Sequence, residues 1–358
     1  MEIKSAQKRE VTINDFEQIR VIGRGGFSKV VLARKIDTGR LYAIKMLKKE
    51  QLINDRKIQP VMRERGVLQR LNHPFLVKLH WAFQSSSDLF FVMDICTGGE
   101  LFFHLLQQRR FSEKLTKFYA AEILLGFKYM HDKHIAYRDI KPENILVDME
   151  GHIRIADFGL SKVIPPNEKS YSFCGSPEFL APEMLQSQEG HDRRLDIFCL
   201  GVLLYEMLTG LPPFYDEDHS RMFERVLYED PVLNQSYLSS EVKKMLSMML
   251  EKDPAARYQS IDEVMQAAWF SDIDWKEALN KQLKPPLVPD VNSSYFEDDD
   301  PEARAETNNS TFQRRERDIS LYYNSTLQQH SVLDESASFH NYSSQARRLF
   351  SGSGVESD

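Results

Sequence analysis

Two carboxylates, a lysine and an amide fall within one short stretch near the middle of the chain. Asp139 is followed by Lys141 and Asn144, and Asp157 opens an Asp-Phe-Gly triplet. Phosphoryl transfer needs such a set, because a carboxylate must accept the hydroxyl proton, oxygen ligands must hold Mg²⁺ and a cation must contact the γ-phosphate. We therefore predict that Asp139 is the base, that Lys141 contacts the phosphate, and that Asn144 and Asp157 are metal ligands. Ordinary turn chemistry is the alternative for this loop, but it does not account for the spacing.

A glycine-rich turn lies between two predicted strands upstream. Glycine lets backbone N–H groups approach phosphates closely, so the turn is a candidate ATP-binding loop. No Gly-Lys-Ser/Thr follows, so the turn is not a Walker P-loop, and Ser28 stands where a third glycine is expected. The predicted nucleotide contacts in this loop are Ile22, Gly23, Arg24, Gly25, Gly26, Phe27, Ser28, Lys29 and Val30.

Lys45 ends an apolar strand, where an inward-pointing ammonium needs an anionic partner. Glu64, on a predicted helix that follows, can supply the carboxylate. The alternative is that Lys45 extends to solvent. With the downstream carboxylates present, we interpret Lys45 and Glu64 as further catalytic residues.

Composition sets limits on the class of protein. The 358 residues contain 42% hydrophobic and 28% charged residues, as in ordinary globular proteins. A net charge of −7 argues against a nucleic-acid or polybasic membrane binder and suits basic substrates. The three cysteines form no metal-binding pair, and no segment is apolar enough to span a bilayer. We expect a cytoplasmic protein, with the nucleus as a second location, no nucleic-acid partner and no integral membrane association.

Hydrophobic periodicity gives a coarse division of the chain. Residues 16–47 read as strands, 61–71 as a helix, 89–93 as a buried strand, and 112–131 as a long helix with Ser112 as its N-cap. The pattern is mainly helical from there to residue 270, except for an irregular stretch at 160–182. Residues 271–358 are rich in Ser, Asn and charge, so we expect a tail that either packs on the core or stays disordered.

Several motifs together resemble the AGC group of eukaryotic serine/threonine protein kinases, in particular the protein kinase B and serum/glucocorticoid-regulated kinase branch. The resemblance covers roughly residues 16–290 and rests on Tyr137 before Arg-Asp, and on the segments 98–102, 173–178, 181–183 and 284–289.

This resemblance implies an α+β, bilobal fold with ATP bound between the lobes. It divides the chain into a short extension (1–15), a catalytic domain (16–270, with lobes of about 16–95 and 96–270) and a C-terminal tail (271–358). Glu183 is expected to form an ion pair with Arg257. The residues expected around the adenine are Ala43, the gatekeeper Met93, the hinge residues Asp94 and Cys96, Glu100 and Leu146.

The resemblance also suggests how substrates are selected. Glu100, Glu143 and Glu206 fall where the group contacts arginines upstream of the target serine or threonine. Each charge-assisted contact can contribute about 1.5–3 kcal/mol. Solvated surface acids are the alternative for any one of them. Ser176 and Phe179 are assigned to the peptide-binding segment, and Ser176 is expected to bond the catalytic Asp and Lys.

Regulation by phosphorylation is a further expectation from the resemblance. Ser172 is the candidate activation-loop phosphosite, phosphorylated by an upstream activating kinase, and Arg138 is its counter-charge. Pro60 replaces a residue near the start of the Glu64 helix that often helps hold the loop phosphate, and proline can donate nothing there. Gly66 weakens the interior of the same helix, so we expect a marginally ordered helix that needs outside support. A hydrophobic motif in the tail could provide that support, through Phe339, Tyr342 and the phosphorylatable Ser343.

Three functions compete at this point. The leading one is an active kinase that transfers the γ-phosphate of Mg-ATP to protein serine or threonine. A pseudokinase scaffold predicts loss of Lys45, Asp139, Asn144 or Asp157, yet all four are present. A small-molecule kinase is disfavoured by segment 173–183, which is typical of peptide docking.

Overall fold

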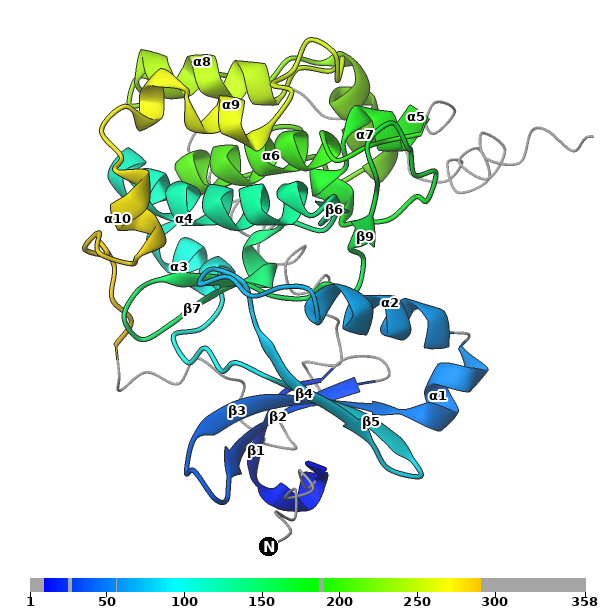
Figure 1. The fold of residues 1–358 in the computed structure, drawn as a ribbon. Helices are drawn as coiled ribbons and strands as arrows, with labels where there is room; N and C mark the ends of the chain where they lie inside the picture. Colours follow the sequence, from blue (N-terminus) through cyan, green and yellow to red (C-terminus); the bar gives the residue numbers. More distant parts are fainter. Residues whose placement is uncertain (1–9, 25–27, 56, 187–189, 291–358) are drawn as a thin grey trace, which may run out of the picture.

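The computed structural model describes residues 10–24, 28–55, 57–186 and 190–290. The chain forms two lobes, a β-rich N-lobe and a mainly helical C-lobe, as the α+β prediction stated (Figure 1). The N-lobe sheet is antiparallel, with strand order β1-β2-β3-β5-β4. Its strands are β1 (Phe16–Arg24), β2 (Ser28–Lys35), β3 (Leu41–Lys48), β4 (Leu79–Gln84) and β5 (Asp88–Met93).

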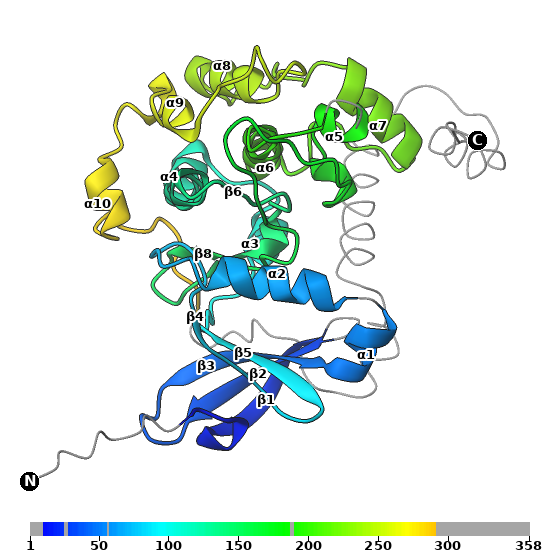
Figure 2. The same ribbon diagram turned by 45° about the vertical axis from the view of Figure 1, so that its right-hand side comes forward.

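Local sequence explains how the first strands connect. Gly23 pairs with Val30 and Arg24 with Lys29, so the described residues on either side of the predicted phosphate loop pair as the ends of β1 and β2. The next turn contains Gly39 at φ 69°, a left-handed conformation that glycine adopts without strain. Two helices follow β3, α1 (Lys49–Asn54) and α2 (Ile58–Leu68), and α2 lies between the sheet and the C-lobe (Figure 2).

The start of α2 corrects the predicted boundaries, because the helix covers 58–68 rather than 61–71. Pro60 lies in the first turn, where its missing N–H breaks no intrahelical hydrogen bond.

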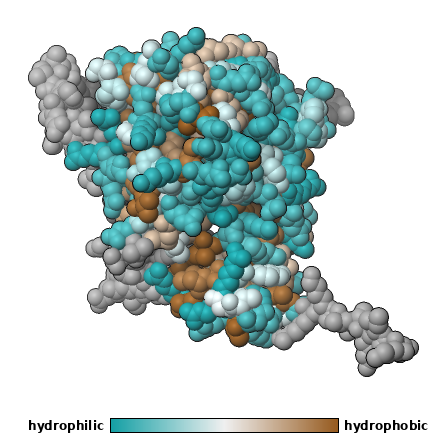
Figure 3. Space-filling view, turned by 60° about the vertical axis from the view of Figure 1, so that its left-hand side comes forward, coloured by the Kyte–Doolittle hydropathy of each residue, from teal (hydrophilic) through white to brown (hydrophobic). Residues whose placement is uncertain are grey.

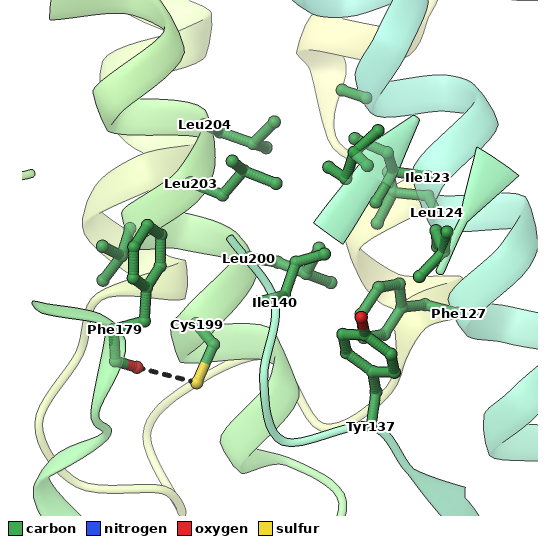
Figure 4. Packing of buried hydrophobic residues seen from close by; sticks show 14 of the residues in the cluster. Ile123, Leu124, Phe127, Tyr137, Ile140, Phe179, Cys199, Leu200, Leu203 and Leu204 are labelled. Carbon is green, nitrogen blue, oxygen red and sulfur yellow. Dashed lines mark hydrogen bonds between the residues drawn. The ribbon is translucent and has the colours of Figure 1, made fainter. Parts of the chain in front are cut away.

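The C-lobe is built around two long helices, α4 (Glu113–Asp132) and α6 (Leu195–Thr209). Ser112 caps α4 as predicted, because its hydroxyl accepts from the amide of Leu115 at 3.3 Å. Leu200 and Leu203 of α6 face Ile123 and Leu124 of α4 in the hydrophobic core (Figure 4). The other helices are α3 (Leu101–Gln108), α5 (Pro182–Gln186), α7 (His219–Tyr228), α8 (Ser240–Met249), α9 (Ile261–Met265) and α10 (Trp275–Leu279).

Short strands and turns lie where the two lobes meet. The strands are β6 (Ile135–Ala136), β7 (Ile145–Val147), β8 (Ile153–Ile155) and β9 (Lys162–Val163), which pair as β6–β9 and β7–β8. Single 3₁₀ turns occur at Ile13–Asp15, Pro142–Asn144, Pro177–Phe179 and Ala268–Phe270.

The first part of the tail packs on the body of the protein. Lys281 pairs with Asp148 at 3.0 Å. A Cβ added at Gly151 would lie 2.2 Å from the carbonyl oxygen of Leu287, so the backbone of the tail runs against this turn. Of the two alternatives for the tail, packing therefore holds up to residue 290. Phe339, Tyr342 and Ser343 lie outside the described residues.

The surface is mainly polar in the view of Figure 3, with smaller apolar areas, one of them on the N-lobe at the bottom. Within the described ranges, no helix combines the length and apolar character needed to cross a membrane.

Candidate active site

Lys45 on β3 and Glu64 on α2 form the expected ion pair. Lys45 Nζ lies 2.7 Å from Glu64 Oε1, and both side chains are largely buried. Burial lowers the pKa of Lys45, but the charges of Glu64 and Asp157 outweigh it and the net pKa is raised. Lys45 is therefore a charged ammonium held at a fixed point between the lobes.

The loop after β6 gathers the catalytic candidates around Asp139. Asn144 Nδ2 donates to Asp139 Oδ2 at 3.0 Å and to its backbone oxygen at 2.8 Å. Ser176 donates to Asp139 Oδ1 at 3.1 Å and accepts from Lys141 Nζ at 2.8 Å. The structure thus brings together the Asp, the Lys and the activation-segment hydroxyl, as predicted. Burial raises the pKa of Asp139, and the charge of Asp157 raises it further.

Asp157 lies near the same groups, because its charge raises the pKa of both Lys45 and Asp139. Its φ of 50° lies in the left-handed region, and its Oδ1 accepts from the amide of Gly159 at 3.1 Å. Phe158 is buried against the ring of Tyr137, with centroids 5.6 Å apart. The packing of Phe158 therefore holds the preceding residue, Asp157, in its strained backbone conformation.

Asp196 is a positioning residue that the sequence reasoning missed. Its carboxylate accepts from the backbone amides of Tyr137 and Arg138 and from His131, each at 2.9 Å. Arg138 has a φ of 70°, so this buried acid holds the loop in a conformation that a non-glycine residue rarely adopts. An aspartate inside the otherwise apolar stretch of α6 was the available signal, because a buried charge must be paired.

The predicted metal ligands fit a hard cation. Asn144 precedes β7 and Asp157 follows β8, so their amide and carboxylate oxygens come from the same, open end of the β7–β8 hairpin. Among the described residues, no cluster of three or more His, Cys, Asp or Glu side chains could hold a metal by itself. Mg²⁺ commonly takes one or two protein ligands and completes its shell with phosphates and water, so the donor set suits a nucleotide-bound ion.

The predicted nucleotide contacts flank this cluster. The residues before and after the loop tip belong to β1 and β2, while Gly25, Gly26 and Phe27 lie outside the described residues. Ala43 pairs with Met93 in the sheet register, and Leu146 bridges to Glu100. The carboxylate of Asp94 bonds His80 and Arg154, and the contact of this hinge residue with a nucleotide stays a prediction.

The activation segment places its serines on Arg138. Arg138 Nη1 donates to Ser172 at 2.6 Å and to Ser170 at 3.3 Å, and Lys162 Nζ donates to Ser170 at 3.0 Å. Burial lowers the pKa of Arg138, and the nearby charge of Arg63 on α2 also lowers it. Arg138 thus contacts the candidate phosphosite Ser172 directly, and Lys162 contacts the neighbouring Ser170.

The candidate substrate-reading residues have different degrees of exposure. Glu100 is the N-cap of α3 and is partly exposed, whereas Glu143 and Glu206 are 8% and 1% exposed. Phe179 is buried in the core, and its carbonyl accepts from the thiol of Cys199 at 3.0 Å (Figure 4). Their contacts with a peptide stay predictions.

The ion pair expected between Glu183 and Arg257 is present. Arg257 donates from Nη1 and Nη2 to the two carboxylate oxygens at 2.9 and 3.1 Å. The guanidinium is buried, so this bidentate pair connects the end of the activation segment to the base of the C-lobe.

Comparison with known proteins agrees with this geometry. The protein kinase domain model matches residues 16–270, and the chain belongs to that family. It is 43% identical over 309 residues to human RAC-beta serine/threonine-protein kinase, covering 84% of this chain and 64% of the relative. A RAC family serine/threonine-protein kinase homolog of Dictyostelium discoideum is 40% identical over 294 residues, covering 81% of this chain and 66% of the relative.

Protein kinase 2 of Dictyostelium discoideum is 43% identical over 293 residues, covering 81% of this chain and 61% of the relative. The chain thus spans less than two thirds of the length of these curated relatives. The AGC-group resemblance seen in the sequence is confirmed by these comparisons.

Proposed function

We propose that this chain is a serine/threonine protein kinase that transfers the γ-phosphate of Mg-ATP to proteins. One observation carries the proposal: the Lys45–Glu64 pair and the Asp139, Lys141 and Asn144 cluster are assembled together. A scaffold that had lost catalysis would be free to lose any of these contacts.

Each side chain has a role that its position supports. Lys45, fixed by Glu64, holds the α- and β-phosphates. Asp139 accepts the proton of the substrate hydroxyl, and its raised pKa brings its basicity closer to that task. Lys141 contacts the transferring phosphoryl group, and Ser176 keeps Lys141 next to Asp139.

A bound Mg²⁺ would neutralise phosphate charge, and Asn144 and Asp157 are the residues that would hold it. Asn144 also donates a hydrogen bond to Asp139. The side chain that would hold the metal therefore also fixes the position of the base. This arrangement supplies positioning and charge stabilisation, which carry most of the catalysis of phosphoryl transfer.

Substrates with arginine upstream of the target are the expected class. Glu100, Glu143 and Glu206 supply the negative charge, and the net charge of −7 favours basic partners. Since Glu206 is almost fully buried, its contact would require a substrate arginine to reach into the C-lobe surface.

Phosphorylation of Ser172 by an upstream kinase is the proposed switch. A phosphate adds about −1.5 to −2 charges and three acceptor oxygens. Arg138 already lies within hydrogen-bonding distance of the hydroxyl, so a phosphate would find its counter-charge in place. Pairing there would order the activation segment beside Asp139.

The test is transfer of labelled phosphate from ATP to an arginine-rich serine peptide after incubation with an activating kinase. Peptides with the arginines replaced by alanine, and with threonine in place of serine, define the substrate class. Transfer should depend on Lys45 and Asp139, so Lys45→Met and Asp139→Asn serve as impaired controls. If the wild type binds Mg-ATP and transfers nothing, the scaffold is the better description.

A further inference from the structure

Three side chains from different elements meet behind the segment that joins the lobes. Asp94 follows β5, His80 lies on β4 and Arg154 lies on β8. Asp94 Oδ1 is 2.7 Å from His80 Nε2, and Asp94 Oδ2 accepts from Arg154 Nη1 at 3.0 Å. We call these three residues the hinge latch.

The backbone around the hinge latch already joins the two lobes. Val77 donates to Ile155 at 2.9 Å, and Ile155 donates to Phe75 at 2.9 Å, so β8 runs beside the segment that leads into β4 (Figure 2). Asp94 and Lys78 also bond each other, because the Asp94 amide donates to the Lys78 oxygen at 3.1 Å and Asp94 Oδ2 accepts from the Lys78 amide at 3.2 Å. Asp94 therefore stands at the point where the N-lobe sheet ends and the C-lobe begins.

The burial of these groups makes their contacts hard to exchange with water. The side chains of Asp94, His80 and Arg154 are 12%, 16% and 25% exposed. Burial raises the pKa of Asp94, yet the His80 hydrogen bond and the Arg154 charge outweigh this and the net pKa is lowered. A carboxylate in such a place is costly to leave unpaired, so the latch resists opening.

We propose that the hinge latch is a positioning device for nucleotide binding, in which Arg154 and His80 fix Asp94 and thereby the hinge backbone. The inference deepens the proposed function, on which it rests. The Asp94 carboxylate is committed to the latch, so only the backbone of this residue is available to an adenine. A hinge fixed before binding loses less freedom when the nucleotide arrives, which favours affinity.

The latch is distinguished from an ordinary ion pair by its effect on nucleotide binding. Arg154→Met keeps the aliphatic stem and removes the charge, and Asp94→Asn keeps the shape of the side chain. We expect each change to raise the Kd for a fluorescent ADP analogue about fivefold, at the low end of typical coupling between sites. The double variant should show no further loss, because both changes open the same contact.

Two more variants separate positioning from general stability. Arg154→Lys retains a cation for Asp94 and should recover most of the affinity. Lys128 Nζ lies 2.9 Å from Asp262 Oδ1 in a more exposed ion pair on the C-lobe. Lys128→Met removes that pair and should leave the Kd at the wild-type value. In phosphoryl transfer, Arg154→Met should raise KM for ATP with little change in KM for the peptide.

The outcomes are distinct. Equal Kd values for wild type and Arg154→Met, or fully additive losses in the double variant, would overturn the hinge latch. A fall in melting temperature without any change in Kd would do the same. Wild type that binds ADP but transfers no phosphate would refute the kinase proposal alone, because the binding measurement still reports on the latch. Wild type that binds no nucleotide would overturn both.

Discussion

Removal of the buried guanidinium of Arg257 should destabilise the C-lobe strongly. Besides its bidentate contact with Glu183, Arg257 donates to the backbone oxygens of Glu251 at 3.0 Å and Arg194 at 3.2 Å. It also stacks over the ring of Phe198 at 5.1 Å. Arg257→Met keeps most of the stem, so the change isolates the charge and its hydrogen bonds.

The magnitude follows from the position of the pair. The Arg257 side chain has no exposed surface and that of Glu183 is 11% exposed, so methionine would leave a nearly buried carboxylate without its cation. Breaking one side of a buried pair costs about 3–5 kcal/mol. At about 2–4 °C per kcal/mol for a unit of this size, the melting temperature should fall by about 6–20 °C.

Thermal and urea unfolding, followed by circular dichroism, measure this loss. Lys128→Met is the matched control, because it removes a more exposed cation and should cost no more than about 1 kcal/mol. The double variant Arg257→Met, Glu183→Leu should recover part of the loss, since no unpaired charge remains. An Arg257→Met loss no larger than that of the control would refute this reasoning.

Other changes have equally defined consequences. Lys45→Met should lower kcat/KM for ATP by at least about tenfold, because a charge-assisted contact of about 1.5–3 kcal/mol is lost while Glu64 remains. Steady-state kinetics at varied ATP concentration measure this loss. The rate of the chemical step should fall as the pH falls through the pKa of Asp139, with a midpoint above the ordinary value of 3.8, because burial raises that pKa; an acidic limb at or below 3.8 would contradict the role of base. Ser112→Ala should cost about 1 kcal/mol in urea unfolding, because the amide of Leu115 loses its cap, and an unchanged midpoint would contradict the cap.

Contacts set by local sequence were the most predictable. The cap at Ser112 depends on residues three apart, and the β1–β2 hairpin follows from glycine between apolar runs. The Lys45–Glu64 pair is long-range, but an inward lysine in an apolar strand has few possible partners. Local rules and the cost of a buried charge were sufficient for these features.

Other features depend on what the fold brings together. The strands β6 to β9 are two or three residues long, too short for any periodicity to appear. The carboxylate of Asp94 turns toward His80 and Arg154, which come from separate elements. Asp196 was visible as an acid in an apolar helix, but only the packing of α6 against the loop after β6 reveals which amides it holds.

The central claim is that the assembled cluster transfers phosphate with Asp139 as its base. Single-turnover transfer from Mg-ATP to an arginine-rich serine peptide, by enzyme already phosphorylated at Ser172, tests it most directly. Asp139→Asn keeps the size and shape of the side chain and one of its two acceptor oxygens. Nucleotide should therefore still bind while the transfer rate falls by about 10²–10⁴-fold. Equal rates for the two proteins would contradict the account.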